Sequence, residues 1–283
     1  MQSMDSFVFV VVMLAAGLHA GWNALLKLRV EPRIASTLLG IASGMVALPI
    51  CFLVPFPEPA TWLYIAASAG IHLVYFQALG IAYETGDLGQ VYPLARGSAP
   101  LLTALGMSIV GEPIGLVGWC GIVLLAGGVL ALSLKGGRVA TRIEVRAVGF
   151  ALLTALTIGA YTIVDGLGAR SVENVGSYVG WSFVTSALVL AVYAVHRWGT
   201  GIFSAFRGST GPLLLGGCMS VGAYGIALWA MTQAPIAIVG AMRETSVLFA
   251  ALIGVLWLGE PLLKLRIAAG ALVLAGVVML RLA

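Results

Sequence analysis

The chain has 283 residues, of which 60% are hydrophobic and only 9% are charged, and its formal net charge is +4. Soluble domains carry about 25% charged residues, so this composition excludes an ordinary soluble protein and indicates a membrane protein. The small positive balance lies between the apolar stretches, so we expect no nucleic-acid partner. The three cysteines form no CxxC pair and histidine is too sparse for a zinc set, so we predict no metal and no cofactor.

Several windows reach the roughly 20 apolar residues that a membrane-spanning helix needs. The first, residues 7–26, lacks the basic start and small-residue end of a cleaved signal, so we expect a spanning helix there. We predict an all-α membrane protein with ten transmembrane helices. The ten windows are residues 7–26, 34–54, 61–83, 88–109, 114–133, 147–167, 176–195, 211–231, 235–258 and 266–282.

The longest polar interval divides these windows into two sets of five. We predict a first five-helix repeat at residues 1–134, a basic linker at 135–146 and a second five-helix repeat at 147–283. Because five helices return the chain on the opposite side, the second repeat would be inverted in the membrane. Inverted repeats recur in transporters, which bind substrate near the membrane midplane.

A sequence correspondence between the halves supports this duplication. The motif Gly-Glu-Pro at residues 111–113 returns at 259–261, at the end of the fourth window of each half. Aligning the two motifs places Arg96 opposite Glu244, one position from Arg243. Both halves therefore carry charge at the same depth of an apolar helix.

These deep charges predict a central site, because a charge within a bilayer is costly and usually faces a cavity or a partner. Arginine binds carboxylate or phosphonate oxygens through a planar fork. Arg96 lies between Pro93 and Pro100, which can open the helix around it. One hypothesis is that Arg96 binds the acidic group of a small zwitterionic metabolite, while Glu244 or the aromatic residues receive its amine. Alternatively, Glu244 neutralises one arginine and the other remains for the substrate.

The other candidate lining residues are polar or aromatic and share helix faces with one another or with these charges. His19 and His72 can relay protons, since histidine titrates near neutral pH, or can simply pack; Glu244 is a further candidate for proton coupling. Asp165 stays ambiguous. The substrate-binding candidates are Arg96, Arg243, Glu244, His19, Trp22, Asn23, His72, Tyr75, Tyr92, Tyr161 and Tyr224.

Helix-ending and helix-packing roles are expected elsewhere. Glu112 and Glu260 stand beside prolines at helix ends, which indicates a structural role. The windows at 114–133 and 266–282 are rich in glycine and almost uncharged. Small residues let helices approach closely in lipid, so we expect these fifth and tenth helices to serve in helix packing or in a homodimer contact, with no substrate role.

Lysine and arginine predict the orientation, because cytoplasmic loops carry them in excess. Only Arg170 and Arg281 lie on one face, so the rule places the other face in the cytoplasm and both termini outside. The eleven residues on the predicted cytoplasmic face are Lys27, Arg29, Arg33, Lys135, Arg138, Arg142, Arg146, Arg197, Arg207, Lys264 and Arg266.

Two five-helix repeats, each with a charged fourth helix ending in Gly-Glu-Pro and a Gly-rich fifth helix, resemble the EamA-type transporters of the drug/metabolite transporter superfamily. The resemblance implies ten helices and movement of small metabolites, commonly amino acids and related compounds, often outward. The segments HAGWNALLK and VYPLARG are also similar to a branch found with phosphonate utilisation. Many members keep both termini in the cytoplasm, so either this branch is inverted or the charge rule misleads here.

An enzyme would require catalytic motifs, which a transporter does not need. The chain has no HExxH, no GxSxG and no aspartate cluster for a metal. We therefore predict a transporter, not an enzyme, that exports small zwitterionic or anionic metabolites across a bacterial-type inner membrane by alternating access. A role in organophosphonate uptake or use is the alternative substrate reading, and an intramembrane enzyme or a scaffold is the alternative class.

Overall fold

The computed structural model describes residues 4–25, 31–86, 88–132, 144–258 and 264–283, and all regular structure in these ranges is α-helical. The helices of the first half are α1 (Ser6–Leu25), α2 (Pro32–Cys51), α3 (Thr61–Thr85), α4 (Leu88–Val110) and α5 (Leu116–Ala131). Those of the second half are α6 (Val145–Arg170), α7 (Val175–Trp198), α8 (Ile202–Gly208), α9 (Thr210–Gln233), α10 (Ile236–Arg243), α11 (Ser246–Leu258) and α12 (Lys264–Leu282).

The helices have the length and composition of membrane spans. Eight segments of the described residues are long and apolar enough to cross a bilayer, and α5 is a shorter apolar helix. Large apolar side chains lie exposed on their outer faces, for example Leu63, Ile109 and Val192. Apolar surface on this scale fits lipid rather than water, so the chain is a multi-pass membrane protein.

The predicted windows coincide with helices, but the predicted number of ten is not what the described residues form. One addition is α8, a short helix between α7 and α9 that was expected to be loop. The other difference is the window at 235–258, which is two helices, α10 and α11. The predicted linker at 135–146 and the second Gly-Glu-Pro motif at 259–261 lie largely or wholly outside the described residues.

The helix break falls in the opposite half from the expected one. Helix α4 runs unbroken through Pro93 and Pro100, so the expectation that these prolines open the helix around Arg96 is wrong. Each proline removes only one backbone donor, which a packed helix can tolerate. The break lies instead at Glu244 and Thr245, whose amide groups bond three residues back, to Ala241 and Met242 at 3.0 and 3.1 Å.

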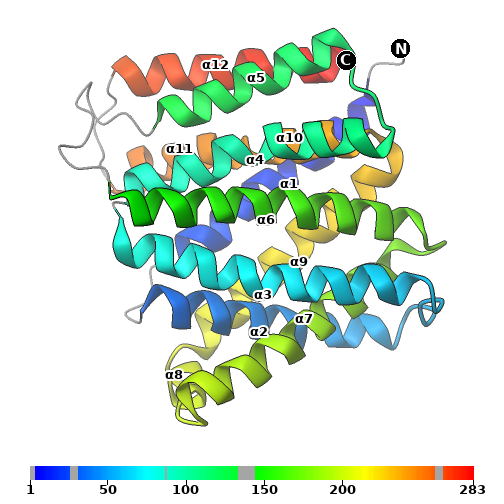
Figure 1. Cartoon of the computed structure of the whole chain (residues 1–283), viewed down its shortest axis with the longest axis vertical. Coiled ribbons are helices and arrows are strands. Elements are labelled where there is room, and N and C mark those ends of the chain that lie inside the picture. Colours follow the sequence, from blue (N-terminus) through cyan, green and yellow to red (C-terminus); the bar gives the residue numbers. More distant parts are fainter. Residues whose placement is uncertain (1–3, 26–30, 87, 133–143, 259–263) are drawn as a thin grey trace.

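The helices pack as a single bundle (Figure 1). Helices α5 and α12 pair at one edge, and α2 packs on α7 towards the other. Between them α3 packs on α6, α1 on α9 and α4 on α6. Helices α6, α9 and α10 also contact one another, and α1 and α4 of the first half contact α10 beside them.

Glycines explain the close pairing of α5 and α12. A Cβ atom at Gly121 would lie 3.0 Å from the Gly276 carbonyl oxygen, and one at Gly128 would lie 2.8 Å from the Ala269 carbonyl oxygen. The glycine faces of these two helices are therefore in contact within one chain, as expected for helix packing in lipid. A homodimer contact through their outer faces remains a prediction.

The two ends of the described chain lie on the same side of the bundle. Arg281 in the last turn of α12 donates from Nη2 to Ser6 Oγ in the first turn of α1, at 3.1 Å. The Arg281 guanidinium also lies 5.0 Å from the ring centroid of Phe9. A chain whose ends meet in this way crosses the membrane an even number of times.

Candidate functional site

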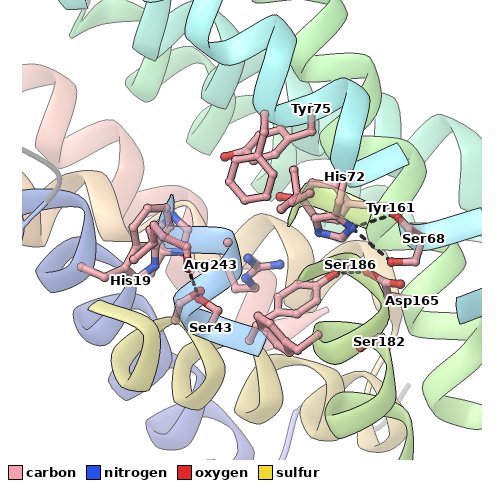
Figure 2. A pocket seen from close by; sticks show the side chains of 18 residues that line it. His19, Ser43, Ser68, His72, Tyr75, Tyr161, Asp165, Ser182, Ser186 and Arg243 are labelled. Carbon is pink, nitrogen blue, oxygen red and sulfur yellow. Dashed lines mark hydrogen bonds between the residues drawn. The ribbon is translucent and has the colours of Figure 1, made fainter. Parts of the chain in front are cut away.

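A cavity of about 80 Å³ lies within the bundle, which is room for several water molecules. Its wall is built by α1, α2, α3, α6, α7, α9 and α10, so both halves contribute (Figure 2). The apolar part includes Trp22, Leu39, Phe76, Phe183 and Leu190. The polar side chains that line it are His19, Ser43, Ser68, His72, Tyr75, Tyr161, Asp165, Ser182, Ser186, Ser220, Tyr224 and Arg243.

Arg243, the last residue of α10, brings a positive charge to this cavity. Its guanidinium lies over the Tyr224 ring, 4.8 Å from the ring centroid. Among the described residues it forms no ion pair. The charge instead makes a cation–π contact with the face of the Tyr224 ring. A cation–π contact stabilises the charge without neutralising it, so the guanidinium remains available to an anion.

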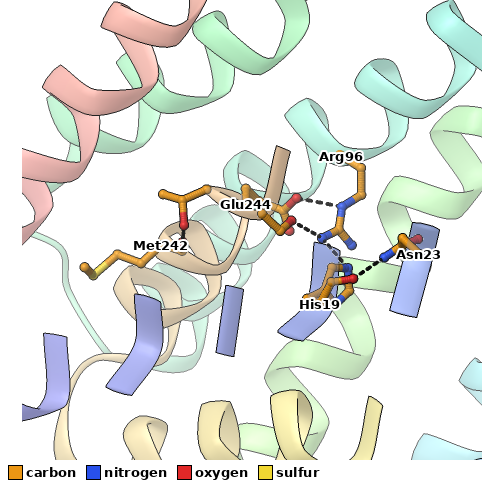
Figure 3. Close-up of polar contacts among 7 residues, drawn as sticks. His19, Asn23, Arg96, Met242 and Glu244 are labelled. Atoms are coloured by element: carbon orange, nitrogen blue, oxygen red, sulfur yellow. Dashed lines mark hydrogen bonds and ion pairs between the residues drawn. The ribbon is translucent and has the colours of Figure 1, made fainter. Parts of the chain in front are cut away.

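Arg96 is occupied by protein groups instead (Figure 3). Its Nε atom forms an ion pair with Glu244 Oε2 at 2.7 Å, and both side chains are almost fully buried. Its Nη2 atom donates to His19 Nε2 at 2.9 Å and to Ser246 Oγ at 3.4 Å. Glu244 is thus paired with Arg96, as in the second of the two alternatives that the sequence left open.

The helix break separates the roles of neighbouring residues. Arg243 lines the cavity, whereas Glu244 points to Arg96 on α4. Thr245 stabilises the break, because its Oγ1 donates to the Met242 carbonyl oxygen at 2.7 Å. The tightened turn therefore directs one charge inwards and the other to the ion pair.

His19 is held in its neutral form by this network. A guanidinium has donors only, so His19 Nε2 must accept the hydrogen bond from Arg96. The His19 ring also packs edge-on against Trp22, with 4.9 Å between ring centroids. Asn23 donates to the His19 carbonyl oxygen at 2.8 Å and does not line the cavity. A proton on Nε2 would displace the bond to Arg96, so this geometry favours packing over proton relay at His19.

Aromatic rings form another part of the cavity wall. His72 Nδ1 donates to the Ser68 carbonyl oxygen at 2.9 Å, and its ring stacks on Tyr161 with 4.4 Å between centroids. Tyr75 and Tyr224 meet Tyr161 edge-on, at 5.6 and 6.0 Å. These contacts fix the rings in place, which gives the cavity a defined shape.

Asp165 is a cavity residue that the sequence left ambiguous. The side chain is 0% exposed to bulk solvent and lines the cavity. Tyr178 donates to its Oδ1 at 2.7 Å, and Tyr224 donates to its Oδ2. The sequence did hold a signal for this residue, because Asp165 follows the candidate Tyr161 by four positions and so shares its helix face.

The structure brings seven of the predicted site residues together around the cavity: His19, Trp22, His72, Tyr75, Tyr161, Tyr224 and Arg243. The other four, Asn23, Tyr92, Arg96 and Glu244, do not line it. Tyr92 lies 6.0 Å from the Arg96 guanidinium, measured to its ring centroid. The cavity serines were missed, because single serines in apolar helices carry no distinguishing pattern.

A second polar cluster lies where α4, α6, α9 and α10 end or begin. Arg170 Nη2 contacts Glu112 Oε1 at 2.9 Å, and its Nε and Nη2 donate to the Met231 and Ala234 carbonyl oxygens at 2.7 and 2.9 Å. Glu112 Oε2 accepts from the Ile236 amide at 3.0 Å, so this carboxylate caps the start of α10. The expected structural role of Glu112 thus includes a tie between the two halves.

No group of three or more histidine, cysteine, aspartate or glutamate side chains that could hold a metal occurs in the described part of the chain. The residues that line the cavity offer hydrogen bonds, aromatic faces and the side chains of Arg243 and Asp165. Such a set can bind a small polar molecule within a mostly apolar wall.

Comparison with known proteins agrees with this architecture. A solved structure described as "Crystal structure of protein" shares the fold, with a TM-score of 0.68 at 17% identity over 97% of this chain and 95% of that chain. A protein of Sinorhizobium sp named "Uncharacterized transporter in cobO 3'region" is 34% identical over 77 residues, which span 26% of this chain and 52%, about half, of the relative. Residues 145–282 match the EamA-like transporter family. The second half of the chain therefore matches the EamA-like transporter family over residues 145–282, in agreement with the family that its repeated charged helices resemble.

Proposed function

We propose that the protein transports small zwitterionic or anionic metabolites, such as amino acids and related compounds, by alternating access around this cavity. The single observation that carries the proposal is Arg243, a buried guanidinium that lines the cavity without an ion-pair partner among the described residues. A charge of this kind is costly within a membrane unless a ligand or water compensates it. A carboxylate or a phosphonate is its natural partner.

Two inverted five-helix repeats are part of this proposal, and the packing of helices supports them. Exchanging the halves pairs α1 with α6, α2 with α7, α3 with α9, α4 with α10 and α11, and α5 with α12. Under this exchange the contact of α1 with α9 becomes that of α6 with α3, and the contact of α2 with α9 becomes that of α7 with α3. The contacts of α4 with α6 likewise become those of α10 and α11 with α1. Such a pattern is expected of ten spans related by a two-fold axis in the membrane plane.

The proposed location is a bacterial-type inner membrane, and the proposed direction is outward. A role in organophosphonate uptake or use is the second candidate, favoured by the segments HAGWNALLK and VYPLARG. The planar fork of Arg243 suits both kinds of oxyanion, so the substrate panel must contain both.

Purified protein in liposomes tests the proposal. Labelled amino acids and 2-aminoethylphosphonate are offered on one side, and the accumulated label is analysed for chemical change. We expect accumulation of an unchanged compound, and Arg243→Gln should weaken its apparent affinity by roughly ten- to a hundredfold, the usual effect of losing one charge-assisted hydrogen bond.

Ser108→Ala is the matched control, because Ser108 lies outside the cavity and donates its hydroxyl to the Ala104 carbonyl oxygen of its own helix. Its transport should stay near the wild-type level. A chemically altered product would indicate an enzyme instead, and the absence of both accumulation and product would indicate a scaffold.

A further inference from the structure

The cavity holds a buried carboxylate that has no cationic partner. Both oxygens of Asp165 accept hydrogen bonds from tyrosine hydroxyls, those of Tyr178 and Tyr224, and the side chain is 0% exposed. No arginine, lysine or histidine forms an ion pair with it in the part of the chain that the structure describes. The hydroxyls hold the oxygens in place but bring no charge, so the negative charge is left to a ligand.

The phenol of Tyr224 contacts both this carboxylate and the positive charge of Arg243. Tyr224 donates its hydroxyl to Asp165, and the Arg243 guanidinium lies over the face of the same ring. The other two deep charges, on Arg96 and Glu244, are in direct contact at 2.7 Å. Arg96 and Glu244 therefore neutralise each other. Asp165 and Arg243 do not touch and both line the cavity, and we call these two residues the open pair.

The open pair defines a chemical class of ligand. A simple anion would compensate Arg243 and leave Asp165 uncompensated, whereas a simple cation would do the reverse. A small zwitterion, with an acidic group and an ammonium group a few bonds apart, compensates both charges at once. The apolar wall of Leu39, Phe76, Phe183 and Leu190 then faces the rest of the molecule.

We propose that Asp165 binds the ammonium group of the substrate while Arg243 binds its acidic group, so that the transported class is amino acids and not carboxylates or amines alone. This inference rests on the proposed function and assigns Asp165, Tyr178 and Tyr224 to it. Tyr178 and Tyr224 act as positioning residues, because they hold the carboxylate through their hydroxyls.

Ligand stabilisation of the purified protein in detergent tests the assignment. Three series of probes separate the two ligand charges: L-alanine with propionate and ethylamine, L-leucine with 4-methylpentanoate and 3-methylbutylamine, and L-phenylalanine with 3-phenylpropionate and 2-phenylethylamine. Apparent dissociation constants come from the rise of the unfolding temperature with ligand concentration. In at least one series the wild type should bind the amino acid more tightly than either analogue.

Two variants should respond in reciprocal ways. Asp165→Asn should weaken binding of the amino acid by roughly ten- to a hundredfold and leave binding of the acid unchanged. Arg243→Gln should weaken binding of the amino acid and leave binding of the amine unchanged. Ser108→Ala, outside the cavity, should bind all three compounds like the wild type. Should Asp165→Asn fail to fold, Tyr178→Phe removes one of the two donors without touching the cavity wall, and it should weaken binding of the amino acid only.

The outcomes separate this inference from the function on which it rests. If Asp165→Asn binds the amino acid like the wild type, or loses acid and amino acid equally, the inference is wrong while the transport proposal stands. Unchanged ligand binding with lost pH-driven transport would make Asp165 a proton site and would also overturn it. If the wild type binds no acid-bearing probe, in this assay or in liposomes, the proposed function fails and the inference with it.

Discussion

At the scale of single residues, the buried ion pair between Arg96 and Glu244 joins the two halves of the chain. Arg96 lies on α4 and Glu244 between α10 and α11, they are 2.7 Å apart, and neither lines the cavity. Removing one partner of a buried pair leaves the other charge buried without a counter-charge, which lowers the free energy of unfolding by about 3–5 kcal/mol. Neutralising both partners avoids that penalty. Because neither residue lines the cavity, the effect of the pair on stability can be measured apart from ligand binding.

We therefore expect Arg96→Gln to lower the unfolding temperature strongly, because Glu244 loses its counter-charge. The double variant Arg96→Gln with Glu244→Gln should recover most of the loss, since two amides can still bond to each other and to His19. Thermal unfolding in detergent measures both variants. Equal destabilisation by the single and the double variant would contradict a direct coupling between the two charges.

The sequence predicted which positions carry deep charge, but not which arginine meets Glu244. Arg243 and Glu244 are neighbours, and successive residues of a helix point about 100° apart. The direction in which each points also depends on the break between α10 and α11, and no proline in the sequence indicates that break. Partner choice also depends on how α4 packs against the second half, and that packing is a property of the whole bundle.

At the scale of helices, two kinds of contact hold the bundle together. The pairing of α5 with α12 depends on bare glycine faces, whereas the ends of α4, α6, α9 and α10 are tied by Glu112 and Arg170. The first kind was expected from glycine content. The second was not, because hydrogen bonds from Arg170 to the carbonyl oxygens of another helix leave no trace in the sequence.

Gly128→Ala should destabilise the protein, because the new Cβ would lie 2.8 Å from the Ala269 carbonyl oxygen. Overpacking of this kind costs about 1–3 kcal/mol. Gly127→Ala is the neighbouring control, since a Cβ at Gly127 meets nothing within 4 Å. Unfolding temperatures of the two variants should differ clearly, and equal values would show that α5 and α12 do not pack through this face.

Arg170→Ala should destabilise more than Glu112→Gln. The arginine supports two carbonyl oxygens besides the ion pair, whereas glutamine at position 112 can still accept from the Ile236 amide. Because both side chains are partly exposed, the ion pair itself contributes only about 1 kcal/mol or less. Arg207→Ala removes a charge from exposed α8 and serves as the control in the same unfolding assay. A larger effect from Glu112→Gln would reverse the assigned roles.

At the scale of the whole molecule, the arrangement of the ends limits the possible topologies. The first turn of α1 and the last turn of α12 are in contact, so both termini lie on one side of the membrane. The proposed five spans in each half would place the junction between the halves on the other side. Hydrophobic windows predicted where the apolar helices lie, but only the lysine and arginine distribution bears on which side is which. Several of those residues, including Lys27, Arg29, Lys135, Arg138 and Arg142, lie outside the described ranges.

Reporter fusions test the arrangement and the orientation separately. A reporter active only in the cytoplasm, placed at residue 138 or after Ala283, should give opposite results at the two sites, because an odd number of spans separates them. The eleven-to-two bias of lysine and arginine further predicts signal at residue 138 and none after Ala283. The reverse pattern would keep the fold but place both termini in the cytoplasm, the arrangement common among the transporters that this chain resembles. The same result at both sites would contradict five spans in the second half, and with them the inverted repeat on which alternating access is built.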